Sequence, residues 1–157
     1  MTMDIFRKIK NLFRSSKQEF AFDSIVDSLR RHNVQLDVDE DGQRCYFTNG
    51  LNYVLSSDRH DPSYFRIVAP CVYDINRNNE LNVLQCMNTV NMTYKVLKFI
   101  ANEDAVHLEV SGYLCTPRDT DTVLNRCFTI TEDACRMLME ETEKSAPANT
   151  TRVVRFR

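Results

Sequence analysis

Three histidines and six cysteines are the side chains of this 157-residue chain best suited to chemistry at neutral pH. His32, His60 and His107 are far apart in the sequence, and only His60 stands in a run of ligand-type side chains, Asp58-Arg59-His60-Asp61. Without a second His or a Cys nearby, this run lacks the ligand set of a zinc site. We therefore predict no metal site.

The cysteines are arranged for packing rather than for reaction. They occupy positions 45, 71, 86, 115, 127 and 135 without a C-x-x-C pair, and most fall in apolar patterns, where burial raises the thiol pKa. A nucleophile needs a lowered pKa and a positioned base. Because Arg7, Lys8 and Lys10 interrupt the first apolar cluster, we expect no secretory signal. We predict free cysteines in a cytoplasmic protein.

The composition also argues against cofactors and nucleic acid. With three glycines and neither a G-x-x-x-x-G-K nor a G-x-G-x-x-G motif, the chain lacks a backbone cradle for phosphate, so we expect no cofactor. A net charge of −2 argues against nucleic acid as a partner. We predict no catalytic residues and no enzyme. The alternative, a small-ligand-binding domain or an enzyme, would require a deep pocket that brings His60 or His107 to a carboxylate.

Two segments with different periodicity show what kind of domain positions these residues. Residues 106–114 alternate between apolar and polar side chains, which is typical of a half-buried strand. Farther along, apolar side chains recur at spacings of three and four, which predicts a helix with one buried stripe. That stripe consists of Leu124, Cys127, Phe128, Thr131, Ala134, Cys135 and Leu138. A sheet face and a helix stripe of this kind pack against each other.

The rest of the chain extends this α+β pattern. Helical spacing over 22–31 and 81–91 predicts two more helices. The second is expected to be buried on two sides, through an arc of Leu81, Leu84, Met87, Val90 and Asn91 that Val83 and Cys86 widen. Strands are expected over 34–38, 44–47, 53–55, 64–72 and 94–100, and Asn49-Gly50 is a hairpin signal. With three or four strands before the central helix, we predict an antiparallel sheet of about five strands packed against helices, in the order α-βββ-α-ββ-α.

The ends of the chain differ from its middle. Residues 1–17 predict a basic amphipathic helix with Ile5, Phe6, Ile9 and Phe13 on its apolar side. This side could dock on the domain, contact a partner or lie weakly on an anionic membrane surface. Residues 18–143 form the expected single domain, and 144–157 a flexible basic tail.

The order of elements and one local phrase resemble a known family. The stretch from Glu80 to Asn91 resembles the central helix of the YbjN-type domain family, a group of bacterial sensory transduction regulators, and includes an Asn-x-x-Asn phrase at Asn88 and Asn91. The resemblance covers about residues 20–143. It implies a fold like that of type III secretion chaperones, which dimerise and bind extended protein segments, and it implies no catalytic site.

Asn88 and Asn91 allow two interpretations. As amides beside an apolar arc they need partners, either by fastening the helix end to the next strand or by contacting a polar ligand. Taken together, the features favour a non-enzymatic protein-interaction or regulatory module that binds a protein client or forms a homodimer. The alternative from a different class is a peripheral membrane adaptor that uses residues 1–17.

Overall fold

Six antiparallel strands form one sheet in the computed structural model, which describes residues 20–145, and their spatial order is β1-β2-β3-β4-β6-β5. The strands are β1 (Leu36–Val38), β2 (Arg44–Asn49), β3 (Leu51–Ser56), β4 (Tyr64–Asp74), β5 (Leu97–Asn102) and β6 (Ala105–Tyr113). The helices are α2 (Phe20–Arg31), α3 (Glu80–Thr93) and α4 (Thr120–Ser145), and the 3-10 turn η1 (Pro117–Asp119) leads into α4.

The predicted α+β class is confirmed, with a correction to the strand count. The sheet has six strands rather than about five, and the order is α-ββββ-α-ββ-α. Strand β4, which the sequence predicts over 64–72, pairs with β3 on one side and with β6 on the other and so joins the two halves of the sheet. The polar run before it is a tight turn, in which the Asp58 carboxylate accepts a hydrogen bond from the His60 backbone N–H at 2.8 Å.

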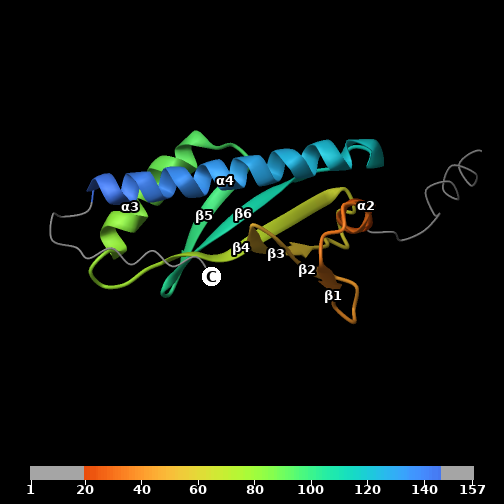
Figure 1. The fold of residues 1–157 in the computed structure, drawn as a ribbon, viewed down its shortest axis with the longest axis horizontal. Coiled ribbons are helices and arrows are strands. Elements are labelled where there is room, and N and C mark those ends of the chain that lie inside the picture. The colour runs from red at the N-terminus through yellow and green to blue at the C-terminus, as the bar shows by residue number, and fades with distance from the viewer. Residues whose placement is uncertain (1–19, 146–157) are drawn as a thin grey trace, which may run out of the picture.

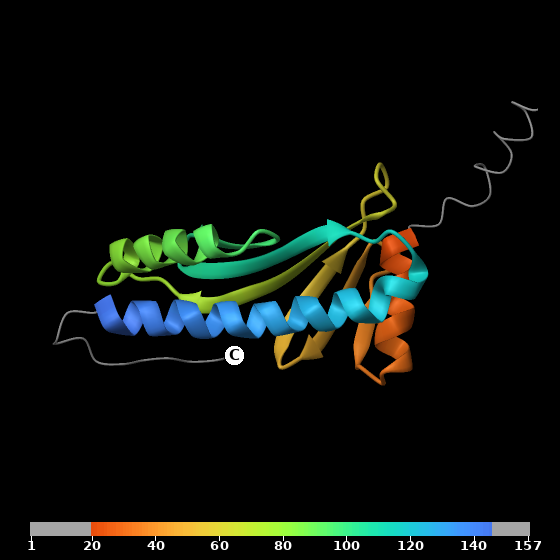
Figure 2. The same ribbon diagram turned by 90° about the horizontal axis from the view of Figure 1, so that it is seen from above.

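All three described helices pack on the same face of the sheet (Figure 1). Helix α4 runs along the whole sheet. Helix α3 contacts the C-terminal half of α4, and α2 crosses near the start of α4, as the view from above also shows (Figure 2). Within the described residues, no helix is both long and apolar enough to cross a membrane.

The core lies between this helical layer and the inner face of the sheet. Strand β6 buries Val106, Leu108 and Val110 as its alternation predicts. The α4 stripe is also confirmed, because Leu124, Cys127, Thr131, Ala134 and Leu138 are buried. Phe128 and Cys135 are half-buried. Both periodicities therefore report the buried face correctly.

The buried face of α3 agrees with the predicted arc except at Leu81 and Leu84. Leu81 and Leu84 are 71% and 40% exposed, whereas Val83, Cys86, Met87 and Val90 are buried. Helix α3 contacts both α4 and β5, so its buried stripe is set by two neighbours. Because apolar residues occur on both sides of this helix, their spacing alone could not indicate which side faces the core.

We expect the exposure difference to decide the cost of truncation. Leu55→Ala, at a fully buried position of β3, should lower the free energy of unfolding by about 2 to 5 kcal/mol because it leaves a cavity. Leu84→Ala on the exposed side of α3 should cost less than about 1 kcal/mol. Urea denaturation of both variants measures the difference, and equal losses would contradict the assigned face of α3.

A polar contact fastens α2 to the first turn of α4. The hydroxyl of the buried Ser28 donates to Oδ1 of Asp121 at 2.5 Å, and Arg31 donates to the same oxygen at 2.9 Å. The hydrogen bond from Ser28, followed by the hydrogen bond and the charge of Arg31, holds the pKa of Asp121 below its usual 3.8. The carboxylate is therefore favoured in the folded state.

This contact should make stability depend on acid pH. Because the folded-state pKa of Asp121 is lowered, its contribution is complete above about pH 5 and is lost as the pH falls through the folded-state pKa. The stability difference between the native chain and Asp121→Asn should therefore shrink between about pH 5 and pH 2. Urea titrations at several pH values test this, and a constant difference would exclude the proposed linkage.

Candidate binding groove

The β2–β3 hairpin brings three elements of the candidate site together. Gly50 takes φ +74°, a conformation that side chains disfavour, and allows the reversal that Asn49-Gly50 predicts. Next to the turn, the Thr48 hydroxyl donates to the Asn52 side-chain oxygen at 2.9 Å. The turn thus sends Phe47 and Tyr53, paired across the hairpin, toward the helical layer.

Aromatic packing joins this hairpin to α4. The rings of Phe47 and Tyr53 stack with centroids 5.2 Å apart, and Phe128 of α4 packs on both, 6.2 Å from Phe47 and 5.5 Å from Tyr53. Aromatic pairs at these separations are favourable beyond the area they bury. The cluster fixes the hairpin against the middle of α4.

Beyond this cluster, a groove of about 410 Å³ opens between the tip of the hairpin and the C-terminal half of α4. Helix α4 lines it with a second stripe at spacings of three and four, beside the buried stripe. This stripe consists of Glu132, Cys135, Arg136, Met139, Glu140 and Glu143. Leu51, Tyr53 and the hairpin turn form the opposite wall. Cys135, Met139 and Leu51 are half-buried and form the floor, and the charged side chains form an exposed rim.

The Tyr53 hydroxyl is the unusual polar group of this site. Tyr53 is only 2% exposed, and its hydroxyl has no hydrogen-bond partner among the residues that the structure describes. Burial raises the pKa of Tyr53, and the nearby Cys135 and Glu132 of α4 add to the increase. The Tyr53 ring packs on Phe128 of α4, and Tyr53 is one of the residues that line the groove. A buried hydroxyl without a partner costs about 1 to 3 kcal/mol relative to one that is hydrogen-bonded.

The rim of the groove is acidic. Glu132, Glu140 and Glu143 surround a single cation, Arg136, and Arg136 forms an ion pair with Asp133 on its own helix. The rim therefore favours a positively charged occupant, while the floor offers contact to apolar side chains.

The thiols near the groove are not arranged for nucleophilic catalysis. Burial raises the pKa of Cys135 and of Cys127 to about 11, so both thiols are protonated at neutral pH. Burial likewise raises the pKa of Cys45 to about 11. Since the thiolate is the reactive form, these cysteines act as small apolar side chains.

The structure places the three histidines in separate local contacts. Nδ1 of His107 accepts a hydrogen bond from the Cys71 backbone N–H at 3.3 Å, in the irregular stretch of β4. The His32 ring lies 2.9 Å from the Ser28 carbonyl oxygen, and His60 belongs to the turn before β4. Among residues 20–145, no group of three or more His, Cys, Asp or Glu side chains could hold a metal ion.

Asn91 and Asn88 have different environments. The Asn91 side chain donates to the Phe99 carbonyl at 3.0 Å and accepts from the Phe99 N–H at 2.7 Å, so it fastens the end of α3 to β5. Asn88 is exposed, and its side-chain amide donates to the Met92 sulfur at 3.9 Å within the same helix. The fastening interpretation therefore holds for Asn91, and Asn88 takes no part in it.

The tyrosines of the sheet are divided between its two faces. Tyr53 lies on the inner face, whereas Tyr46 and Tyr113 are 43% and 63% exposed on the outer face. The Arg66–Glu109 ion pair, at 2.6 Å, crosses the same face. The outer face is thus a mixture of aromatic and charged side chains. The residues predicted to contact a partner or membrane, Ile5, Phe6, Ile9 and Phe13, lie outside the described part of the chain.

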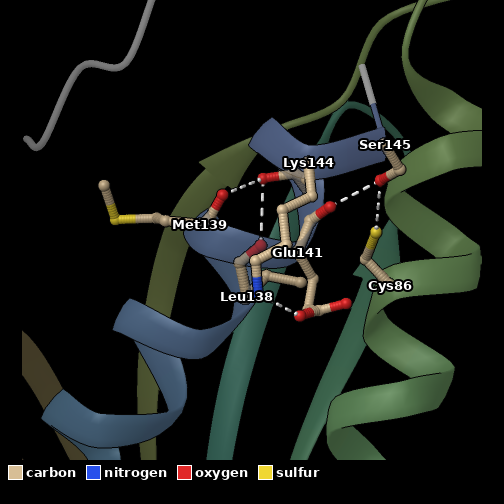
Figure 3. A network of polar contacts seen from close by, with 7 residues as sticks. Cys86, Leu138, Met139, Glu141, Lys144 and Ser145 are labelled. Atoms are coloured by element: carbon tan, nitrogen blue, oxygen red, sulfur yellow. Dashed lines mark hydrogen bonds and ion pairs between the residues drawn. The ribbon is translucent and has the colours of Figure 1, made fainter.

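Contacts with α3 hold the end of α4 that borders the groove (Figure 3). The Cys86 sulfur lies 3.3 Å from the Ser145 hydroxyl, and Asn82 donates to the Thr142 carbonyl at 3.3 Å. Met139 points to the opposite side of α4 from Cys86 in this view. Helix α4 therefore presents one side to α3 and another to the groove.

Comparison with known proteins supports a fold relation. The described fold is similar to the crystal structure of YbjN, a putative transcription regulator from E. coli, with a TM-score of 0.54 and 10% sequence identity. The match covers 78% of this chain and 91% of that chain. No family model and no curated protein sequence matches this chain. The predicted YbjN-type fold is thus supported at the level of structure, while family membership and the secretion-chaperone likeness remain predictions.

Sequence reasoning missed the groove, although one signal was present. The α4 segment continues past the buried stripe with a parallel series of acidic side chains around Met139. A series of this kind is usually a solvated helix face. Only the position of the hairpin tip beside it makes a groove.

The thiol of Cys135 provides a direct test of the groove floor. With a pKa of about 11, its alkylation by iodoacetamide should rise about tenfold per pH unit from pH 8 to pH 10. A free cysteine peptide, with its pKa near 8.5, should reach its plateau in the same range. Peptide mapping by mass spectrometry separates Cys135 from the other thiols. A plateau for Cys135 below pH 9 would contradict its burial.

Proposed function

We propose that this chain is a non-enzymatic protein-interaction module that binds an extended, basic and partly apolar polypeptide segment in the groove between α4 and the β2–β3 hairpin. The observation that carries the proposal is the buried Tyr53 hydroxyl, which lacks a partner beside this groove. A polypeptide backbone supplies both donors and acceptors for such a group.

Size and charge support the same class of ligand. A volume of about 410 Å³ is within the usual range for binding pockets, but the groove is open along its length between a helix and a hairpin tip. The floor offers Leu51, Cys135 and Met139 to apolar side chains, and the glutamates of the rim offer charge to Lys or Arg. A regulatory module that acts by binding protein segments would use a surface of this kind.

The groove, rather than the outer sheet face, is the favoured surface. A second hollow, of about 560 Å³, lies over β1–β3 and is lined by Tyr46, Val54 and Pro70 together with polar side chains. The charged pair of Arg66 and Glu109 limits the apolar area of that face. Dimerisation through the outer face is therefore the less favoured alternative.

Selection from a phage-displayed library of random 12-residue peptides, followed by fluorescence anisotropy, tests the proposal on the full chain. Selected peptides should be rich in Arg, Lys and apolar residues. Met139→Lys should weaken their binding more than tenfold, because it places a cation on the floor. Tyr53→Phe should weaken binding about three- to tenfold, because it removes one hydrogen bond.

Met92→Lys is the matched control, since Met92 is 81% exposed on α3, outside the groove lining. It should leave binding unchanged. Thermal unfolding of each variant shows whether the fold is retained. Peptides that bind Met139→Lys as well as they bind the native chain would overturn the proposed site, and so would the absence of any selected peptide.

A further inference from the structure

The charge of the groove rim is complementary to a segment of the chain itself. Residues 146–157, which directly follow α4, contain Arg152, Arg155 and Arg157 and no acidic side chain. Between these arginines stand Val153, Val154 and Phe156. This segment therefore has the chemistry that the rim and the floor favour.

The segment is also long enough to reach the groove. From Ser145 back to Glu132, thirteen residues of helix correspond to about 20 Å. Twelve extended residues span about 40 Å, and if about four of them are used to reverse direction, about 26 Å remain. The three arginines can therefore reach Glu143, Glu140 and Glu132 without strain in the chain.

We propose that residues 146–157 of this chain occupy the groove, with arginines against the glutamate rim and with Val153, Val154 or Phe156 on the floor beside Met139. This inference rests on the proposed function, because it makes the chain's own segment a competitor for the groove. A partner peptide must displace this segment. Groove occupancy by the segment would thus set the apparent affinity for the partner.

Photo-crosslinking in the full chain tests the placement. Replacing Phe156 by benzoylphenylalanine should give cross-links to α4 residues 136–143 or to Leu51. Glu140→Lys together with Glu143→Lys should reduce the yield severalfold, as should raising the salt from about 50 to 500 mM. Glu80→Lys with Glu103→Lys, at exposed positions outside the groove lining, is the matched control and should leave the yield unchanged.

Isotope labelling identifies the molecule that supplies the segment. In a mixture of ¹⁵N-labelled and unlabelled chains, the proposal predicts cross-links within one chain. Cross-links between labelled and unlabelled chains would replace it by occupancy from a second copy. Cross-links outside the groove, or none, would overturn it.

A second measurement separates this inference from the proposed function. Reversing the charge at Arg152, Arg155 and Arg157 to Glu should tighten binding of a selected peptide, tenfold if the segment occupies the groove for about 90% of the time. The control is charge reversal at three exposed positions, Arg77, Lys95 and Lys98, which should leave the affinity for the peptide unchanged. Unchanged affinity in the tail variant overturns the inference and leaves the proposed function intact. Groove cross-links without any selected peptide would overturn the proposed function alone.

Discussion

The packing of α4 across the sheet is the contact on which the rest of the structure depends. One helix of 26 residues covers the inner face, and its buried stripe meets strands from both halves of the sheet. Its start is fixed to α2 through Ser28 and Asp121, and its end to α3 through Cys86 and Ser145. Burial of apolar area supplies most of the driving force, and these polar contacts set the position of the helix along the sheet.

The groove is a consequence of this arrangement. Phe128 holds the hairpin against the middle of α4, and beyond that point the hairpin ends while the helix continues. The side chains that α4 would otherwise bury against a longer strand are left at the surface. Within residues 20–145, the buried hydroxyl of Tyr53 is packed but has no hydrogen-bond partner. Most buried polar atoms in folded proteins are hydrogen-bonded, so this hydroxyl is an exception.

Prediction from sequence succeeded for elements in which the apolar residues lie on a single face. The alternation of β6 and the stripe of α4 each face a single layer, so the pattern of apolar residues identified the buried side. Asn49-Gly50 located a hairpin because its backbone conformation is a local property. The prediction that Leu81 and Leu84 of α3 are buried was wrong, because apolar residues on two sides of this helix leave the buried side undecided. The sequence left open whether three or four strands precede α3. The pairing of β4 with β6 shows that there are four.

The sequence by itself determined the class of fold, the element order except for one strand, and the packing role of Cys45 and Cys127, since these follow from local preferences and from the period of the buried face. The tertiary structure alone decided that Tyr53 faces α4 and that Asn91, but not Asn88, bonds to Phe99. It also decided that acidic residues of α4 border a groove. These features depend on contacts between residues that are distant in the sequence. Such contacts are determined by the joint packing of helices and strands rather than by any one segment.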